Sequence, residues 1–303
     1  MTCINPRLAY RKTNGQFTLA KIGDNAPIEK STLVPCGQCM ACRINHQRQW
    51  ATRMVHESYS HKESCFLTLT IDDEHRNATH SVDQRDMQLF IKRLRKELQP
   101  QKIRIFFCAE YGSTTQREHY HAILFGYMPK DKTPWKKNKQ GDMLYTSEQL
   151  TRLWGKGHTS VGQFNSTTAD YCAKYVTKAY IGKDKENAYN WVDENGETIQ
   201  RKPPFQSSSK RPGLGSDFYD KHKAQLYAHD FTVIDGKQRP LPKAYDRKFR
   251  KENPELFETV KRKRHNTMIE NLNQDPHQKT KSFRRATKTI LEQQLHLNKR
   301  DQT

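Results

Sequence analysis

The chain has 303 residues, and its 53 Lys and Arg against 33 Asp and Glu give a formal net charge of +20. A surplus of this size repels itself unless a polyanion is bound, so nucleic acid is the expected partner. Hydrophobic residues make up only 34% of the chain, yet 4 Trp, 13 Tyr and 13 Phe can build a core, which excludes a wholly disordered basic tail.

A membrane protein is also excluded by the pattern of apolar residues. The longest apolar runs, residues 65–71 and 122–128, are far shorter than the roughly 20 residues needed to span a bilayer. The first residues contain no apolar signal segment, so we expect the protein to stay in the cytoplasm of its cell.

The predicted elements follow one another in a regular order. Residues 1–35 predict irregular structure with short strands. Apolar spacing then predicts helices and strands in alternation, with Ser81 to Gln84 resembling a capping box before the second helix. The expected elements are a helix over 43–61, a strand over 65–71, a helix over 81–98, strands over 103–109 and 119–127, a helix over 147–154, a strand over 158–161 and a helix over 168–180.

This order predicts an α+β fold with a β-α-β-β-α-β core. We expect an antiparallel sheet of about four to five strands with helices on one face. Four segments are predicted: a Cys-rich segment with its following helix at 1–62, the core at 63–182, basic loops at 183–243 and a basic, helical C-terminal arm at 244–303. The arm holds 15 Lys and Arg against 8 Asp and Glu.

Two histidines form the first candidate site. His119 and His121 lie two apart in a predicted strand, so their side chains project from the same face. Glu110 ends the partner strand of the same hairpin and can add a carboxylate. Two imidazoles and a carboxylate can hold a divalent cation with open positions for water or phosphate. The alternative is a pair of polar residues on a solvated strand face.

A helix carries the second candidate site. Tyr171, Lys174, Tyr175 and Lys178 fall at i, i+3, i+4 and i+7, so they share one helical face. A phenol can attack phosphorus if a neighbouring cation lowers its pKa from about 10. The alternative is an amphipathic helix whose tyrosines reach the surface.

Together these motifs resemble the HUH endonucleases that initiate rolling-circle replication. The two-tyrosine helix resembles the initiators of microviruses, and the segment Cys36-Gly-Gln-Cys39-Met-Ala-Cys42 is similar to their gokushovirus branch. The strand Phe66-Leu-Thr-Leu-Thr70 matches the first motif of the family. Tyr120 departs from it, since an aliphatic residue is frequent there.

The resemblance implies a mechanism and a set of partners. Glu110, His119 and His121 would hold Mg²⁺ or Mn²⁺. Tyr171 or Tyr175 would attack single-stranded origin DNA, leaving a 5′-phosphotyrosine and a free 3′-OH for a polymerase, and the other tyrosine would act in the second cut that closes the displaced circle. Lys174 and Lys178 would stabilise the phosphate or activate the tyrosines. The cell would be a bacterial host.

The cysteines predict a separate metal site. Cys36, Cys39 and Cys42 at C-x₂-C-x₂-C spacing, with Cys3, can form a Cys₄ zinc site, although an iron–sulfur cluster also accepts this spacing. Since the implied chemistry transfers no electrons, zinc is favoured.

Two features complete the expectation. The sequence contains no Gly-x-x-x-x-Gly-Lys-[Ser/Thr] motif, so no ATP site of that type is expected and unwinding would need a host helicase. The alternative function is a non-catalytic, zinc-containing nucleic-acid-binding protein. The doubled Tyr-x-x-Lys argues against it, because binding alone does not need that unit.

Overall fold

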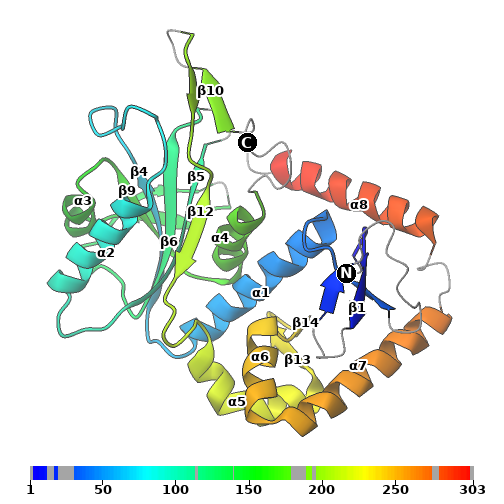
Figure 1. The fold of residues 1–303 in the computed structure, drawn as a ribbon. Coiled ribbons are helices and arrows are strands. Elements are labelled where there is room, and N and C mark those ends of the chain that lie inside the picture. Colours follow the sequence, from blue (N-terminus) through cyan, green and yellow to red (C-terminus); the bar gives the residue numbers. More distant parts are fainter. Residues whose placement is uncertain are drawn as a thin grey trace. The chain divides into compact units, whose positions relative to one another are not determined.

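The computed structural model describes residues 3–11, 17–19, 31–112, 115–138, 140–178, 189–192, 196–274 and 280–300. These residues form eight helices and fourteen strands (Figure 1). The chain divides into two compact units, one of residues 1–46 with 261–303 and the other of residues 47–260. Each helix within the described ranges is too short or too polar to cross a membrane.

The larger unit is built on a seven-stranded antiparallel sheet. Its strand order is β12-β5-β6-β4-β9-β8-β7. The four strands expected from the sequence form its centre, and three more strands widen it, so the α+β class is confirmed while the sheet exceeds the four to five strands expected. The strands are β4 (Ser64–Thr70), β5 (Arg104–Tyr111), β6 (Glu118–Phe125), β7 (Thr133–Lys137), β8 (Met143–Thr146), β9 (Thr159–Gln163) and β12 (Phe205–Ser208).

Helices cover both faces of this sheet, and the expectation of a single covered face is wrong. Figure 1 shows α2 (Gln84–Glu97) and α3 (Glu148–Trp154) on one side, and α1 (Met40–Ser58) and α4 (Ser166–Lys178) on the other. The reason lies in the central strands, in which consecutive residues such as Phe106 and Phe107 are both buried, one toward each face. Apolar side chains on both faces require two helical layers.

Helix α2 begins later than the capping box indicates. Its N-cap is Asp83, whose carboxylate accepts the N–H of Arg85 at 2.8 Å, whereas the Ser81 hydroxyl donates to the carbonyl of Thr79. The phenol of Tyr120 accepts the N–H of Asp83 at 2.8 Å from the core below. The buried aromatic at position 120 therefore anchors the start of α2.

Residues 183–243 are predicted as basic loops, and this is wrong for their described part. It contains β10 (Asn190–Val192), β11 (Thr198–Gln200), β12, α5 (Ser216–His229), β13 (Phe231–Ile234) and β14 (Lys237–Pro240). Helix α5 is hard to recognise because its inward residues are few and aromatic among many charges. They pack with α6 (Lys243–Glu252) and the start of α7 (Pro254–Gln274) in one cluster of Tyr219, Leu226, Tyr227, Leu241, Tyr245, Phe249 and Phe257.

The smaller unit combines the two ends of the sequence. It holds a three-stranded sheet in the order β2-β1-β3 and the C-terminal helix α8 (Lys281–Arg300). Leu291 of α8 is buried in one cluster with Ile4 and Ala41. The C-terminal helix thus packs against the segment that carries the cysteines, and the four segment boundaries drawn from the sequence stay a prediction. The strands are β1 (Arg7–Arg11), β2 (Phe17–Leu19) and β3 (Ser31–Val34).

Candidate active site and metal centre

The first candidate site lies on the sheet face that α4 covers. In the β5–β6 hairpin Glu110 pairs with His119, and on the other side of β6 Thr68 of β4 pairs with His121. Because side chains alternate along strands, all four point to this face, while Tyr120 points to the opposite one. The register of three neighbouring strands therefore places these residues.

His121 and Glu110 lie in contact and are almost fully buried. The Nε2 atom of His121 is 3.3 Å from Oε1 of Glu110, and its Nδ1 atom is 3.2 Å from the Thr68 hydroxyl. His121 is 4% exposed and Glu110 7%. The ring of Phe66 stacks on that of His121 at 5.7 Å. The imidazole is thus held at both nitrogens and on its face.

His119 is oriented by the backbone. Its Nδ1 atom is 2.8 Å from the carbonyl oxygen of Arg117. A carbonyl only accepts, so Nδ1 carries the proton and Nε2 carries the lone pair. Metal-ligating histidines are fixed in this way by the hydrogen bond of the other nitrogen. A Cβ on Gly112 would lie 3.1 Å from Cε1 of this ring, so glycine leaves room for it.

The donor set fits a divalent cation, although the three side chains are not drawn together. Among the described residues, the group of three or more metal-ligating side chains with closely gathered donor atoms consists of cysteines. His119 stands apart from the contacting pair of Glu110 and His121. One carboxylate oxygen and two imidazole nitrogens on one face suit a hard or borderline cation such as Mg²⁺ or Mn²⁺.

Tyr171 faces the same site from α4. Its ring lies edge-on to that of His121, with centroids 5.2 Å apart, and edge-on to Phe66 at 5.8 Å. Lys174 follows one turn later and is partly buried. The structure describes Tyr175 and Lys178 only as backbone of α4, so the predictions for these two side chains lie outside the described residues.

Helix α4 is held at the residue before Tyr171. The side-chain amide of Gln47 donates to the carbonyl of Asp170 at 3.2 Å, and Arg239 pairs with the Asp170 carboxylate at 3.4 Å. Burial raises the pKa of Asp170, and Arg239 opposes this shift. These two contacts fix the height and rotation of Tyr171 above the sheet.

Sequence reasoning missed several of these positioning residues. Phe66 and Thr68 were recognisable, since alternation along β4 places both on the face of His121. Gln47 and Arg239 carry no local signal, because their contacts to Asp170 span 123 and 69 positions.

The four cysteines are brought together as the sequence predicts. Their sulfurs all lie within 4.8 Å of one another, and all four are free and partly buried. Cys3 Sγ lies 3.6 Å from Cys36 Sγ and 3.7 Å from Cys39 Sγ. This cluster could hold a metal ion.

Backbone N–H groups also favour a thiolate in the cluster. Burial opposes ionisation of Cys39, but N–H groups of Cys42, Ile4 and Asn5 point at its sulfur and lower its pKa to about 6. The N–H of Cys39 in turn lies 3.2 Å from Cys36 Sγ. Thiolates are the form that metals bind.

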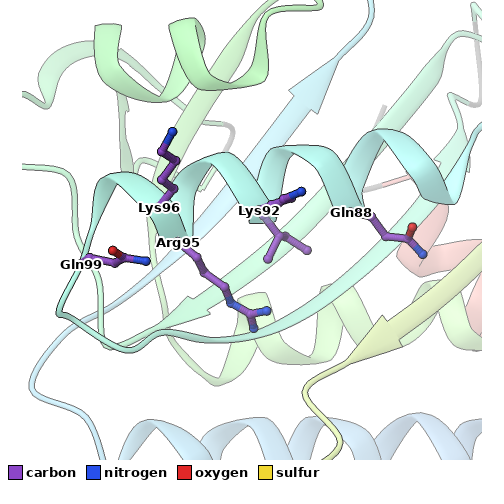
Figure 2. Close-up of a pocket in the computed structure, with 6 residues that line it drawn as sticks. Gln88, Lys92, Arg95, Lys96 and Gln99 are labelled. Carbon is purple, nitrogen blue, oxygen red and sulfur yellow. The ribbon is translucent and has the colours of Figure 1, made fainter.

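A separate hollow of about 530 Å³ lies on the outer side of α2. Figure 2 shows the polar and basic side chains along this helix, and none of the candidate site residues belongs to it. It is lined by Gln88, Ile91, Lys92, Arg95, Lys96 and Gln99.

Comparisons with known proteins agree with this arrangement. Residues 64–180, which contain β4 to α4 and every candidate residue of the sheet site, match the family of the replication-associated protein ORF2. The chain is similar to replication-associated protein VP4 of Bdellovibrio phage phiMH2K, with 30% identity over 266 residues, 85% of this chain and 80% of that protein.

Two further relatives extend the similarity. Replication-associated protein ORF2 of Spiroplasma virus 4 is 27% identical over 287 residues, covering 87% of this chain and 86% of its own length. Replication-associated protein ORF4 of Chlamydia phage 1 is 27% identical over 226 residues, covering 72% of this chain and 54% of its own length. No solved structure matches the chain.

The fold, the paired histidines and these similarities define the class as phage replication-associated proteins. Within that class the chain belongs to the family of microvirus-type replication initiators, as its motifs predict.

Proposed function

We propose that the protein nicks single-stranded DNA at a replication origin by tyrosine attack and later rejoins the displaced strand. The observation that carries the proposal is the sheet face on which Glu110, His119 and His121 lie beneath Tyr171. A nucleophile beside two histidines and a carboxylate is an arrangement for chemistry on phosphate, which a simple binding protein does not need.

In this proposal each residue has a defined task. Glu110, Nε2 of His119 and His121 would hold Mg²⁺ or Mn²⁺, which supplies Lewis-acid polarisation of the scissile phosphate when bound. The Tyr171 oxygen forms a bond to phosphorus and the bond to the 3′ oxygen breaks, giving a 5′-phosphotyrosine and a 3′-OH. Lys174 neutralises phosphate charge. In the reverse direction a 3′-OH attacks the phosphotyrosine and frees the phenol.

Tyr175 completes the proposal as the second nucleophile. Positions i and i+4 of a helix are about 6 Å apart, so either phenol could serve one site. Lys178 would act for Tyr175 as Lys174 does for Tyr171. A host polymerase would extend the 3′-OH.

The test is formation of an adduct that survives SDS. The protein is incubated with a single-stranded origin oligonucleotide and Mn²⁺, and the covalent product is counted. We expect adduct with the parent and with Tyr59→Phe, a control at an exposed phenol in the same unit. Tyr171→Phe and Tyr175→Phe should each keep single-round cleavage and fail at a second, coupled cut.

Two variants decide between cleavage and binding alone. The Tyr171→Phe/Tyr175→Phe double variant should form no adduct, and His121→Ala should bind DNA but not cut it, because the basic surface supplies affinity. An adduct with the double variant would place the nucleophile elsewhere. Binding without any cleavage by the parent would favour the zinc-containing binding protein.

We also propose that Cys3, Cys36, Cys39 and Cys42 hold one structural zinc ion. With Zn–S bonds of about 2.3 Å, the sulfurs of a tetrahedral site are about 3.8 Å apart, and the measured separations are 3.6 and 3.7 Å. An iron–sulfur cluster binds each sulfur to a different iron and so spreads the sulfurs further. Metal analysis should find one zinc per chain, lost on Cys39→Ser. A metal-free, fully folded parent would refute this.

A further inference from the structure

The β7–β8 hairpin at the edge of the large sheet has features that the proposed cleavage site does not use. Strand β7 is the last strand of the sheet order, and all five of its residues are exposed. One of them, Trp135, is 54% exposed. A tryptophan in this position loses apolar burial in the isolated protein.

A β-bulge directs Trp135 away from the sheet. Pro134 pairs with Tyr145 and Lys136 pairs with Leu144, so Trp135 is the extra residue between them. Bulges occur at sheet edges and re-aim a side chain. The indole is therefore presented to the outside by the backbone itself.

Lysines surround this indole. Four exposed lysines lie in or next to β7, and Lys136 Nζ lies 4.0 Å from the centre of the Trp135 ring. Both nearby carboxylates are engaged: Asp131 accepts the N–H of Gln149 at 2.8 Å, and Asp142 accepts the side-chain amide of Asn138 at 3.1 Å. The lysines are Lys130, Lys132, Lys136 and Lys137.

Protection of a sheet edge explains only part of this pattern. Lysine and proline on an edge strand hinder pairing with other chains, so Pro134 and the lysines fit that role. An exposed Trp135 does the opposite, because a large apolar side chain on an edge promotes association. The tryptophan needs a separate reason.

We infer that this hairpin is a second contact for single-stranded DNA, in which Trp135 stacks on a base and the lysines neutralise phosphates. An exposed aromatic within a basic surface is the combination that binds single strands without reading their sequence. Duplex bases are not accessible for such stacking. The hairpin therefore distinguishes single-stranded from double-stranded DNA.

The hairpin lies within reach of a strand held at the proposed cleavage site. Four strand-to-strand steps separate β6 from β7, which at about 4.8 Å each make about 19 Å along the sheet. Several nucleotides span this length. The inference extends the proposed function, yet the DNA contact exists whether or not the protein cleaves DNA.

The experiment measures affinity by anisotropy of a labelled oligo-dT strand, with no divalent metal added, so cleavage does not enter. We expect Trp135→Ala to weaken binding about fivefold or more and Trp135→Phe to retain most of it, since a phenyl ring still stacks. Binding to a duplex of equal length should be unchanged in both. Thermal melting should be unchanged as well, because the indole is exposed.

A charge-matched pair tests the lysines. Lys136→Gln/Lys137→Gln and Arg95→Gln/Lys96→Gln remove the same charge, the second from the α2 surface of Figure 2. Only the first should lower the salt slope of oligo-dT binding, by about 1.4 for two phosphates. Equal effects of both pairs, or unchanged oligo-dT affinity of Trp135→Ala, would overturn the inference. Failure of the cleavage assay with these results intact would count against the nuclease alone.

Discussion

Acidification is expected to loosen the packing of α5 and α6 on α1 through one buried histidine. His56 is fully buried, stacks on Phe218 at 3.9 Å and contacts the hydroxyls of Tyr245 and Thr232 at 2.9 and 3.0 Å. Tyr245 donates its own proton to the carbonyl of Gly215, so it accepts from Nδ1–H of His56. Thr232 must then donate to Nε2, which fixes a neutral imidazole.

The size of the effect follows from the pKa of His56. Burial lowers it from 6.5 to about 3, with a smaller contribution from the nearby His222. As pH falls below about 6.5, the unfolded chain takes up a proton that the folded chain refuses, so stability is lost. At 1.36 kcal/mol for each pH unit, acidification from pH 8 to pH 5 removes about 2 kcal/mol.

The assay is denaturant unfolding of the larger unit at pH 8 and pH 5. The parent is compared with His56→Gln, whose amide can accept from Thr232 but does not titrate. We expect the variant to be less stable at pH 8 and to lack this 2 kcal/mol share of the pH dependence. Carboxylates with lowered pKa values, such as Glu57, act at lower pH. An identical pH dependence in both proteins would refute the reasoning.

Three further predictions concern the sheet and its supports. Gly157→Ala should cost about 3 kcal/mol or more, because its Cβ would lie 2.6 Å from the carbonyl oxygen of Thr70, whereas Gly236→Ala, with open space around it, should cost about 1 kcal/mol in the same melting assay. Glu57→Gln should cost about 3 kcal/mol in denaturant unfolding at pH 7, because Arg104 loses its buried partner; an unchanged midpoint would contradict this. Thr68→Val should leave melting unchanged but lower adduct formation about tenfold and raise the Mn²⁺ requirement, since His121 loses the hydroxyl that orients it; parental metal dependence would contradict this.

The central strands and helices were predictable because their apolar periodicity is strong. Strand β4 and helix α4 begin within two residues of their expected starts. The hairpin that pairs Glu110 with His119 was also within reach, since a short loop leaves few registers. Neighbouring residues settle such features.

The remaining features depend on contacts distant in sequence. Strand β12 contains one apolar residue, Phe205, and takes its place only because β5 offers an open edge. No strand is expected from the sequence over residues 133–146, where the bulge at Trp135 interrupts the alternation of β7. The packing of Leu291 against Ile4 joins opposite ends of the chain, and no local pattern encodes it.

The late position of β12 in the sequence affects how the sheet is completed during synthesis. Strands β5 and β6 are joined by a short hairpin and can pair soon after they leave the ribosome, whereas Phe205 must be made before it can pair with Ala109. Until then β5 carries an unpaired edge beside the residues of the proposed active site. A chain that stops before β12 should therefore aggregate through that edge, so the roughly hundred residues between β5 and β12 set a vulnerable interval in translation.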